Sequence, residues 1–287
     1  MEKSQNITSR FEERMASFVS EVNASATSLV DPLVVFGISL RAKTAPEQWQ
    51  VVQENLNQTI KSLENQTNKN FIVLIAGHDR PSLKKRSVNV HWIRANWARP
   101  TEVSRYSGDK QRKRRLTLAA LKKTELSGFY FFMLDADDLV HKDVCDFILT
   151  DDNRAGYVVD KGYVYDVPSK TLGALKGTTP FYEHCGSCAA VWLTKDELPE
   201  SSSDKETLIH RIRDHVTLPE TMRENGKCAQ KIPFFAVFYY LNHGVNNLVL
   251  KGEKAQRKSS LAGRHKVLEQ VKKDNIAKAF SISNFDL

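Results

Sequence analysis

An apolar run that ends in clustered carboxylates constrains this chain more than any other stretch. Residues 128–134 read Gly-Phe-Tyr-Phe-Phe-Met-Leu, and Asp135, Asp137 and Asp138 follow within the next four positions. A short, continuous apolar run is typical of a strand buried on both faces of an α/β sheet. The acids then fall at the carboxyl end of that strand, where open α/β sheets bind their ligands. The sequence therefore predicts a ligand site at this strand end.

The three acids also indicate which ligand to expect. Carboxylates this close repel one another unless a positive charge lies between them. Carboxylate oxygens suit Mg2+ and Mn2+, so the cluster predicts a divalent cation that carries a diphosphate. The alternative is a solvated acidic turn that caps the next helix at Asp138 or His141. The position at the end of a sheet strand favours the metal site.

Apolar runs alternate with helical periodicities along the first half of the chain. Continuous apolar runs predict buried strands at 33–40, 71–77, 88–93 and 129–134. Apolar residues at three-to-four spacing predict helices over about 11–22, 49–63 and 113–123. In the second half, strands are expected at 156–159, 162–167, 188–193 and 234–241, the first two antiparallel, with a helix near 208–212. This order is typical of an α/β fold with a mixed, mostly parallel central sheet flanked by helices.

The chain divides into three expected segments. Residues 1–30 form an N-terminal helical segment that Asp31-Pro32 interrupts. Residues 31–250 form the main domain, and 251–287 form a basic linker followed by a C-terminal helix. We expect that helix to dock on the domain. A second subunit of a homodimer and an anionic membrane surface are the alternatives.

Charge and cysteine content narrow the functional class. Lys and Arg number 42 against 34 Asp and Glu, so the net charge of +8 should attract nucleotide phosphates, nucleic acid or acidic lipid headgroups. No apolar run reaches the length of a membrane span, no apolar signal core follows Met1, and four cysteines fit reduced thiols. We therefore expect a cytoplasmic protein, with peripheral membrane contact as an option. Cys185 and Cys188 form one Cys-x-x-Cys pair, but a zinc site would need to recruit His184 or His215.

Several motifs follow one another in the order of a known enzyme fold. Ile38-Ser39-Leu40-Arg41 closes the first strand, and Ser62-Leu63-Glu64-Asn65-Gln66-Thr67 ends the next helix. Leu134-Asp135-Ala136-Asp137-Asp138 closes the acidic strand. Over about residues 33–150 this ordered set resembles the GT-A glycosyltransferases, most closely the family 2-like group.

The resemblance implies a GT-A fold and a reaction. A sugar would move from a nucleotide-diphosphate sugar, with a UDP-sugar the expected donor, to a glycan or lipid-linked hydroxyl acceptor. The motif implies that Asp135 faces the ribose and that Asp137 binds Mn2+ or Mg2+, with Asp138 as the competing ligand. His243 is the expected C-terminal metal or diphosphate contact, and His215 is its alternate. Neutral imidazole is a suitable ligand for Mn2+.

The resemblance also implies a nucleotide pocket. Ser39 and Arg41 lie where the first strand ends, and Asp79 lies in the loop after the second strand. Lys110 and Arg114 are one helical turn apart, so they can face the same ligand and contact phosphate or ribose.

The polar loop 181–188 lies where the family places its acceptor and donor-sugar contacts. An inverting enzyme needs a carboxylate base near the acceptor hydroxyl. The family's usual Glu-Asp pair is not evident here. Glu183 ranks first as catalytic base, ahead of Asp196 and Asp204, and the choice between inversion and retention stays open.

Competing functions have less support in the sequence. A nucleotidyltransferase of related fold would place glycines in the loop 39–44, which has none, and a haloacid-dehalogenase-like phosphatase would carry its acids on the first core strand. The basic stretch with Arg105, Lys110 and residues 112–115 favours a nucleic-acid-binding or nucleic-acid-modifying protein, or is a solvated helix face. Against nucleic acid, no recognised binding motif is present, and clustered acids repel phosphate unless they hold a metal.

Overall fold

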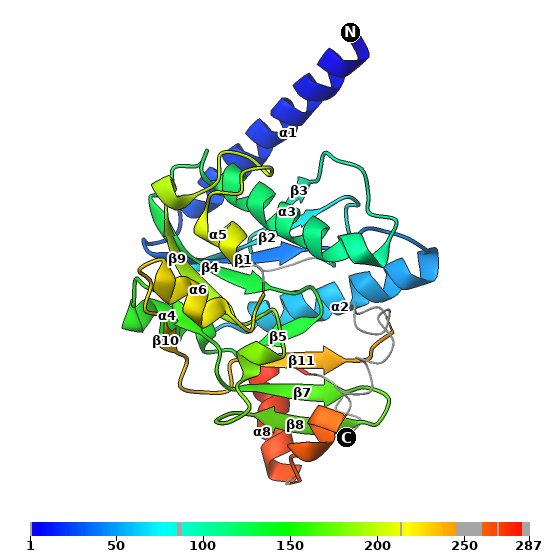
Figure 1. The fold of residues 1–287 in the computed structure, drawn as a ribbon, viewed down its shortest axis with the longest axis vertical. Coiled ribbons are helices and arrows are strands. Elements are labelled where there is room, and N and C mark those ends of the chain that lie inside the picture. Colours follow the sequence, from blue (N-terminus) through cyan, green and yellow to red (C-terminus); the bar gives the residue numbers. More distant parts are fainter. Residues whose placement is uncertain (1, 85–87, 213, 245–259, 269, 283–287) are drawn as a thin grey trace.

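A mixed sheet of seven strands lies between two layers of helices (Figure 1). The computed structural model describes residues 2–84, 88–212, 214–244, 260–268 and 270–282. The helices are α1 (Glu2–Ala26), α2 (Pro46–Glu64), α3 (Val103–Leu121), α4 (Val144–Asp151), α5 (Leu208–Arg211), α6 (Leu218–Glu224) and α8 (Gln270–Phe280), with short 3-10 helices at Phe181–Glu183 and Lys195–Glu197. The strands are β1 (Leu33–Ser39), β2 (Phe71–Gly77), β3 (Val90–Arg94), β4 (Gly128–Leu134), β5 (Asp138–Val140), β6 (Tyr157–Val158), β7 (Gly162–Asp166), β8 (Thr171–Leu175), β9 (Ala189–Thr194), β10 (Gln230–Lys231) and β11 (Val237–Leu241).

The strand order of the large sheet is β10-β6-β9-β4-β1-β2-β3. Strands β4, β1, β2 and β3 run parallel, and β9 pairs antiparallel with both β4 and β6. The order β3-β2-β1-β4 is compatible with a Rossmann-like fold. The prediction of an α/β fold with a mixed, mostly parallel sheet is confirmed.

The central strands read as unbroken apolar runs because helices or a second sheet cover both of their faces. In β1, Val34, Phe36 and Ile38 pack into one core with α2, α4 and the smaller sheet. Leu33 and Val35 point into the other core, with α1, α3, α5 and α6. Figure 1 shows α2 and α3 on opposite sides of the sheet. In a strand buried on both faces, polar and apolar residues do not alternate, because neither face is exposed to solvent.

A second sheet of four strands, in the order β5-β11-β7-β8, packs beside the first. Strand β5 begins at Asp138, so the acidic turn between β4 and β5 joins the two sheets. The predicted antiparallel strands at 156–159 and 162–167 do form strands, but β6 and β7 lie in different sheets. Each pairs antiparallel with another partner, β6 with β9 and β7 with β8.

Both ends of the described chain pack on the domain. Helix α1 buries Met15, Phe18 and Val22 beside α3 and β3. Helix α8 buries Ile276 and Phe280 against aromatic and aliphatic residues of the small sheet. The predicted basic linker at 251–260 lies outside the described residues except for its last position. Among the described helices, none combines the length and apolarity needed to cross a membrane.

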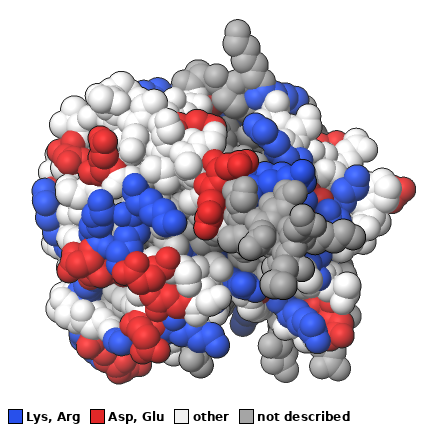
Figure 2. Space-filling view, turned by 90° about the horizontal axis from the view of Figure 1, so that it is seen from above, with Lys and Arg blue, Asp and Glu red and all other residues white. Residues whose placement is uncertain are grey.

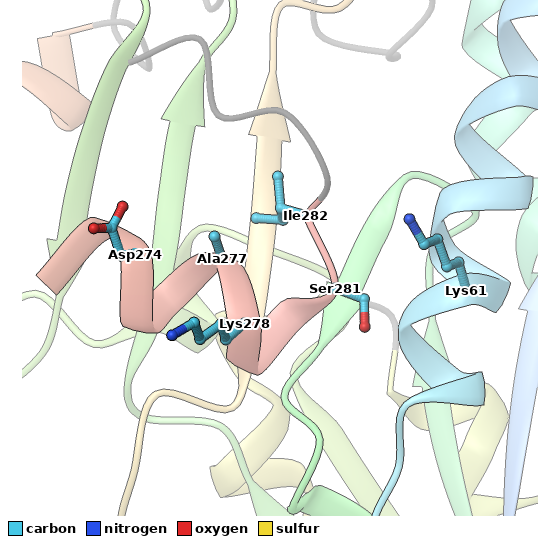
Figure 3. Close-up of a pocket in the computed structure, with 6 residues that line it drawn as sticks. All are labelled: Lys61, Asp274, Ala277, Lys278, Ser281 and Ile282. Atoms are coloured by element: carbon cyan, nitrogen blue, oxygen red, sulfur yellow. The ribbon is translucent and has the colours of Figure 1, made fainter. Parts of the chain in front are cut away.

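A pocket of about 530 Å³ opens between α2 and α8 (Figure 3). It is lined by Lys61, Asp274, Ala277, Lys278, Ser281 and Ile282. Lys61 belongs to the last turn of α2, which leads into the start of β2. This pocket therefore lies near the amino edge of the parallel strands. The acidic turn lies at their carboxyl edge, and none of the predicted site residues lines this pocket.

Candidate metal centre

Three carboxylates converge where β4 ends. Ligand oxygens of Asp135, Asp137 and Asp138 all lie within 4.8 Å of one another. Within the described residues, this triad is the one group of three or more acid, His or Cys side chains placed closely enough to hold a metal ion. The cluster lies at the carboxyl end of a central strand, as the sequence predicts.

Asp135 faces positive charge from α3. Its carboxylate forms an ion pair with the Lys110 ammonium, and the Arg114 guanidinium lies on the same side. Burial alone would raise the pKa of Asp135, but these two cations lower it below the ordinary value. The Ser39 hydroxyl donates to the Lys110 carbonyl at 3.1 Å, which ties the end of β1 to α3. The structure thus brings four of the predicted nucleotide-pocket residues together.

Asp137 contacts His243, which follows β11 far along the chain. His243 Nε2 lies 2.8 Å from Asp137 Oδ2, and Nδ1 lies 3.0 Å from the Asn55 side-chain nitrogen. Because the Asn55 amide donates to Nδ1, the proton of the neutral ring sits on Nε2 and is donated to Asp137. In this arrangement His243 supports Asp137. Direct binding of a metal through Nε2 requires the Asn55 amide to turn over so that its oxygen accepts from Nδ1.

A left-handed backbone conformation at Asn242 positions His243 next to Asp137. Asn242 has φ of +58°, a conformation that Asn tolerates better than most residues. Its side-chain amide donates to Asp166 Oδ1 at 2.5 Å. Asp166 is buried at the end of β7, so the turn is fastened to the small sheet.

Asp138 is fully buried, and its two carboxylate oxygens have different surroundings. Oδ2 accepts from the Ser187 hydroxyl at 2.5 Å and from the Cys185 thiol at 3.0 Å. Oδ1 is buried and has no hydrogen-bond partner among the described residues. Burial, reinforced by the neighbouring Asp137 and Asp135, raises the pKa of Asp138 well above its usual range. A buried acceptor without a donor costs about 1–3 kcal/mol, and a bound cation would remove that cost. The donor set therefore fits a hard divalent ion.

The loop that precedes β9 closes over the triad. A Cβ atom at Gly186 would lie 3.1 Å from both Asp135 Oδ2 and Lys110 Nζ, so this loop approaches the ion pair as closely as a glycine allows. Glu183, the predicted base, is exposed on the 3-10 helix before this loop, and no described hydrogen bond or ion pair joins it to the triad. Cys185 and Cys188 point into cores on opposite sides of the sheet. This separation argues against a Cys-x-x-Cys zinc site.

Two further predicted residues organise nearby loops. Asp79 accepts a hydrogen bond from the Lys43 backbone amide at 2.9 Å and pairs with Arg99 at 2.6 Å. The Arg41 guanidinium lies over the Tyr106 ring, 5.0 Å from its centroid. Both residues lie at the carboxyl edge of the parallel strands, where the sequence predicts them. The contacts described for them join loops to one another or to α3, and not to the acidic triad.

A buried network around Asp109, the residue before Lys110, was not predicted from the sequence. The Asp109 carboxylate binds His78 at 2.9 Å, the Trp97 indole at 2.8 Å and the Lys113 ammonium at 2.5 Å. Lys113 also donates to the Leu40 carbonyl at 2.8 Å. Burial opposes ionisation of Asp109, but His78, Lys113 and Trp97 prevail and lower its pKa to about 2. Asp109 is the one acid inside the basic stretch and lies four residues before Lys113. This spacing on a helix could have indicated the buried pair.

The basic stretch of α3 is largely turned into the protein. Lys113 and Arg115 are buried, and Arg115 donates to the Ser202 carbonyl at 2.9 Å. The Arg112 guanidinium lies 4.1 Å from the centroid of the Trp97 ring. Figure 2 shows basic and acidic side chains interspersed on the face seen from above. The interpretation of the whole stretch as a solvated or nucleic-acid-binding face is therefore weakened.

No family model matches this chain. A search of curated proteins also finds no match. Function must therefore be inferred from the site itself.

Proposed function

We propose that this protein is a GT-A type glycosyltransferase that uses a divalent cation and a nucleotide-diphosphate sugar, with a UDP-sugar as the expected donor. The observation that carries the proposal is the triad Asp135, Asp137 and Asp138, in which a buried Asp138 oxygen has no donor among the described residues. Lys110 pairs with Asp135, and the positive charge of Arg114 also acts on that carboxylate. Acids alone would repel a diphosphate. Acids that hold a cation and lie next to basic side chains favour the binding of a diphosphate.

Each residue has a distinct part in this proposal. Asp137 and Asp138 would hold Mn2+ or Mg2+, which supplies charge neutralisation of the leaving diphosphate. Lys110 and Arg114 add positive charge beside the phosphates, and Asp135 accepts a hydrogen bond from the ribose. His243 keeps Asp137 in place through its 2.8 Å contact.

Two parts of the proposal depend on residues near the rim of the site. Glu183 is exposed, so an incoming acceptor hydroxyl can reach it, and it remains the predicted base. Arg41 and Asp79 lie where parallel strands end, which is the edge at which α/β sheets bind nucleotides. The acceptor is expected to be a glycan or a lipid-linked sugar.

Calorimetric titration of UDP in the presence and absence of Mn2+ tests this function. We expect UDP to bind with Mn2+ and to bind at least tenfold more weakly without it, and we expect GDP to bind more weakly than UDP. Asp137→Asn should abolish release of UDP from a UDP-sugar without unfolding the protein. The matched control is Asp143→Asn, an acid outside the triad that is paired with Lys142, which should keep full activity. UDP binding that is absent, or indifferent to Mn2+, would refute the proposal.

A further inference from the structure

The Ser187 hydroxyl joins two members of the acidic triad. It accepts a hydrogen bond from the Asp135 backbone amide at 2.8 Å. A hydroxyl has one proton to donate, and here that proton goes to Asp138 Oδ2 at 2.5 Å. Because Ser187 is fully buried, water does not compete for these two bonds. The direction of hydrogen bonding therefore runs from the Asp135 amide through Ser187 to Asp138.

The Cys185 thiol makes a second contact with the same oxygen. It donates to Asp138 Oδ2 at 3.0 Å, and its sulfur accepts from the Ser187 amide at 3.3 Å. Two donors from one loop thus hold Oδ2. A carboxylate fixed through one oxygen cannot rotate, so the position of the other oxygen is fixed as well.

We propose that Ser187 and Cys185 are positioning residues for a cation: they turn Asp138 so that its Oδ1 is the oxygen that binds the ion. Oδ1 is buried and has no partner among the described residues, whereas Asp137 is 24% exposed and is already held by His243. This assigns the fully buried metal ligand to Asp138 and leaves Asp137 as the partly exposed one. The inference rests on the proposed cation site, but it does not depend on the sugar donor.

Neighbouring groups that hold a ligand in place usually change metal affinity by about 10–100-fold when they are removed. We expect Ser187→Ala to weaken Mn2+ binding by about tenfold, because Asp138 then loses its strongest donor. Cys185→Ala should weaken binding less, because a thiol is a weaker donor than a hydroxyl and the Ser187 bond to Oδ2 remains. Cys185→Ser keeps a donor and should bind Mn2+ more tightly than Cys185→Ala. This rescue separates positioning from simple packing.

Ser62→Ala is the matched control. The Ser62 hydroxyl is also fully buried, accepts from the Val140 amide at 3.1 Å and donates to the Thr59 carbonyl at 2.7 Å. Its loss should cost stability but leave Mn2+ affinity unchanged, because it does not touch the triad.

The experiment titrates Mn2+ into the full chain. The fraction of bound Mn2+ is measured by calorimetry and from the paramagnetic resonance signal of the free ion. Urea unfolding of each variant is measured in parallel. Weaker binding by Ser187→Ala than by an equally destabilised Ser62→Ala, with rescue by Cys185→Ser, supports the proposal. Equal Mn2+ affinity in Ser187→Ala and wild type overturns it while leaving the glycosyltransferase function standing. If wild type binds Mn2+ but not UDP, the glycosyltransferase function fails and the positioning role stands. A wild type that binds no Mn2+ overturns both.

Discussion

Asp109 has a side chain that is only 9% exposed, and three hydrogen-bond donors surround it. Its pKa of about 2 is lower than the ordinary value of 3.8. The ionised form therefore stabilises the fold above about pH 4, by about 2 kcal/mol, and this contribution is lost as the pH falls toward 2. We predict that Asp109→Asn lowers the free energy of unfolding at pH 7 and that its deficit relative to wild type shrinks by about 1 kcal/mol at pH 3.

Urea unfolding of both proteins at pH 7 and pH 3, followed by circular dichroism, measures this difference. Glu220→Gln is the control, because its pair with Arg223 is exposed and surface pairs contribute little. A deficit of Asp109→Asn that is the same at both pH values would show that the carboxylate does not titrate as described.

Gly186 allows a separate prediction about the ion pair of Asp135 and Lys110. In Gly186→Ala, the new methyl group would lie 3.1 Å from both partners, so one of them must move by a few tenths of an ångström. We expect UDP affinity in the presence of Mn2+ to fall several-fold while the urea midpoint changes little, since Lys110 is flexible. Gly108→Ala, on the exposed face of α3 with open space around it, should leave affinity unchanged. Equal affinities in the two variants would contradict the close approach seen here.

At the residue scale, part of the site follows from the sequence and part does not. Asp135 and Lys110 could be predicted to meet, because strands that run parallel end at the same edge and α3 leads directly into β4. Ser187 and Cys185 could not, since their position depends on β9 pairing antiparallel with β4. That pairing joins residues distant in sequence, and no local pattern specifies it. The loop 181–188 was predicted to contribute to the site through Glu183, and not through Ser187 and Cys185, which contact Asp138 in the structure.

The element that places His243 is the turn after β11, in which Asn242 adopts a left-handed conformation. Alanine at this position costs about 1–2 kcal/mol in that conformation and also removes the bond to Asp166. We therefore predict that Asn242→Ala is destabilised and that its Mn2+-dependent UDP binding weakens, because His243 no longer holds Asp137. Asn242→Gly keeps the backbone conformation without the side chain and should lose less stability. Thermal unfolding and UDP titration measure both effects. If Asn242→Ala were more stable than Asn242→Gly, backbone strain would not be the cause of the lost stability.

The sequence predicted whole elements best where burial was complete. Strands β1, β2 and β4 were recognised because both faces are covered, which leaves an unbroken apolar signal. Helix α3 begins at Val103, well before the expected start near Lys113, because its first half is polar and lacks an apolar stripe. Strand β8 has Gly173 and Ala174 at its centre, and both residue types are depleted in strands, so it gave no strand signal.

Across the whole molecule, the net charge of +8 does not translate into a basic face on α3. Lys113 and Arg115 are buried, and Lys110 faces Asp135. The charge of Lys113 lowers the pKa of Asp109, and the charge of Lys110 lowers the pKa of Asp135. Composition alone does not decide between nucleic acid and other anionic partners, because a count of charges does not say which of them reach the solvent.

The acidic turn between β4 and β5 connects the two sheets, and His243 returns to it from β11. An ion bound at this turn would therefore strengthen the connection between the two sheets. Because binding to the folded state alone stabilises that state, Mn2+ should slow hydrogen exchange in β5 and β11 more than in β2. Exchange measured by mass spectrometry with and without Mn2+ would reveal this, and uniform slowing across all strands would argue against it. A cation at this turn would then stabilise the small sheet as well as bind the proposed donor, so that metal binding and stabilisation of the fold would occur together.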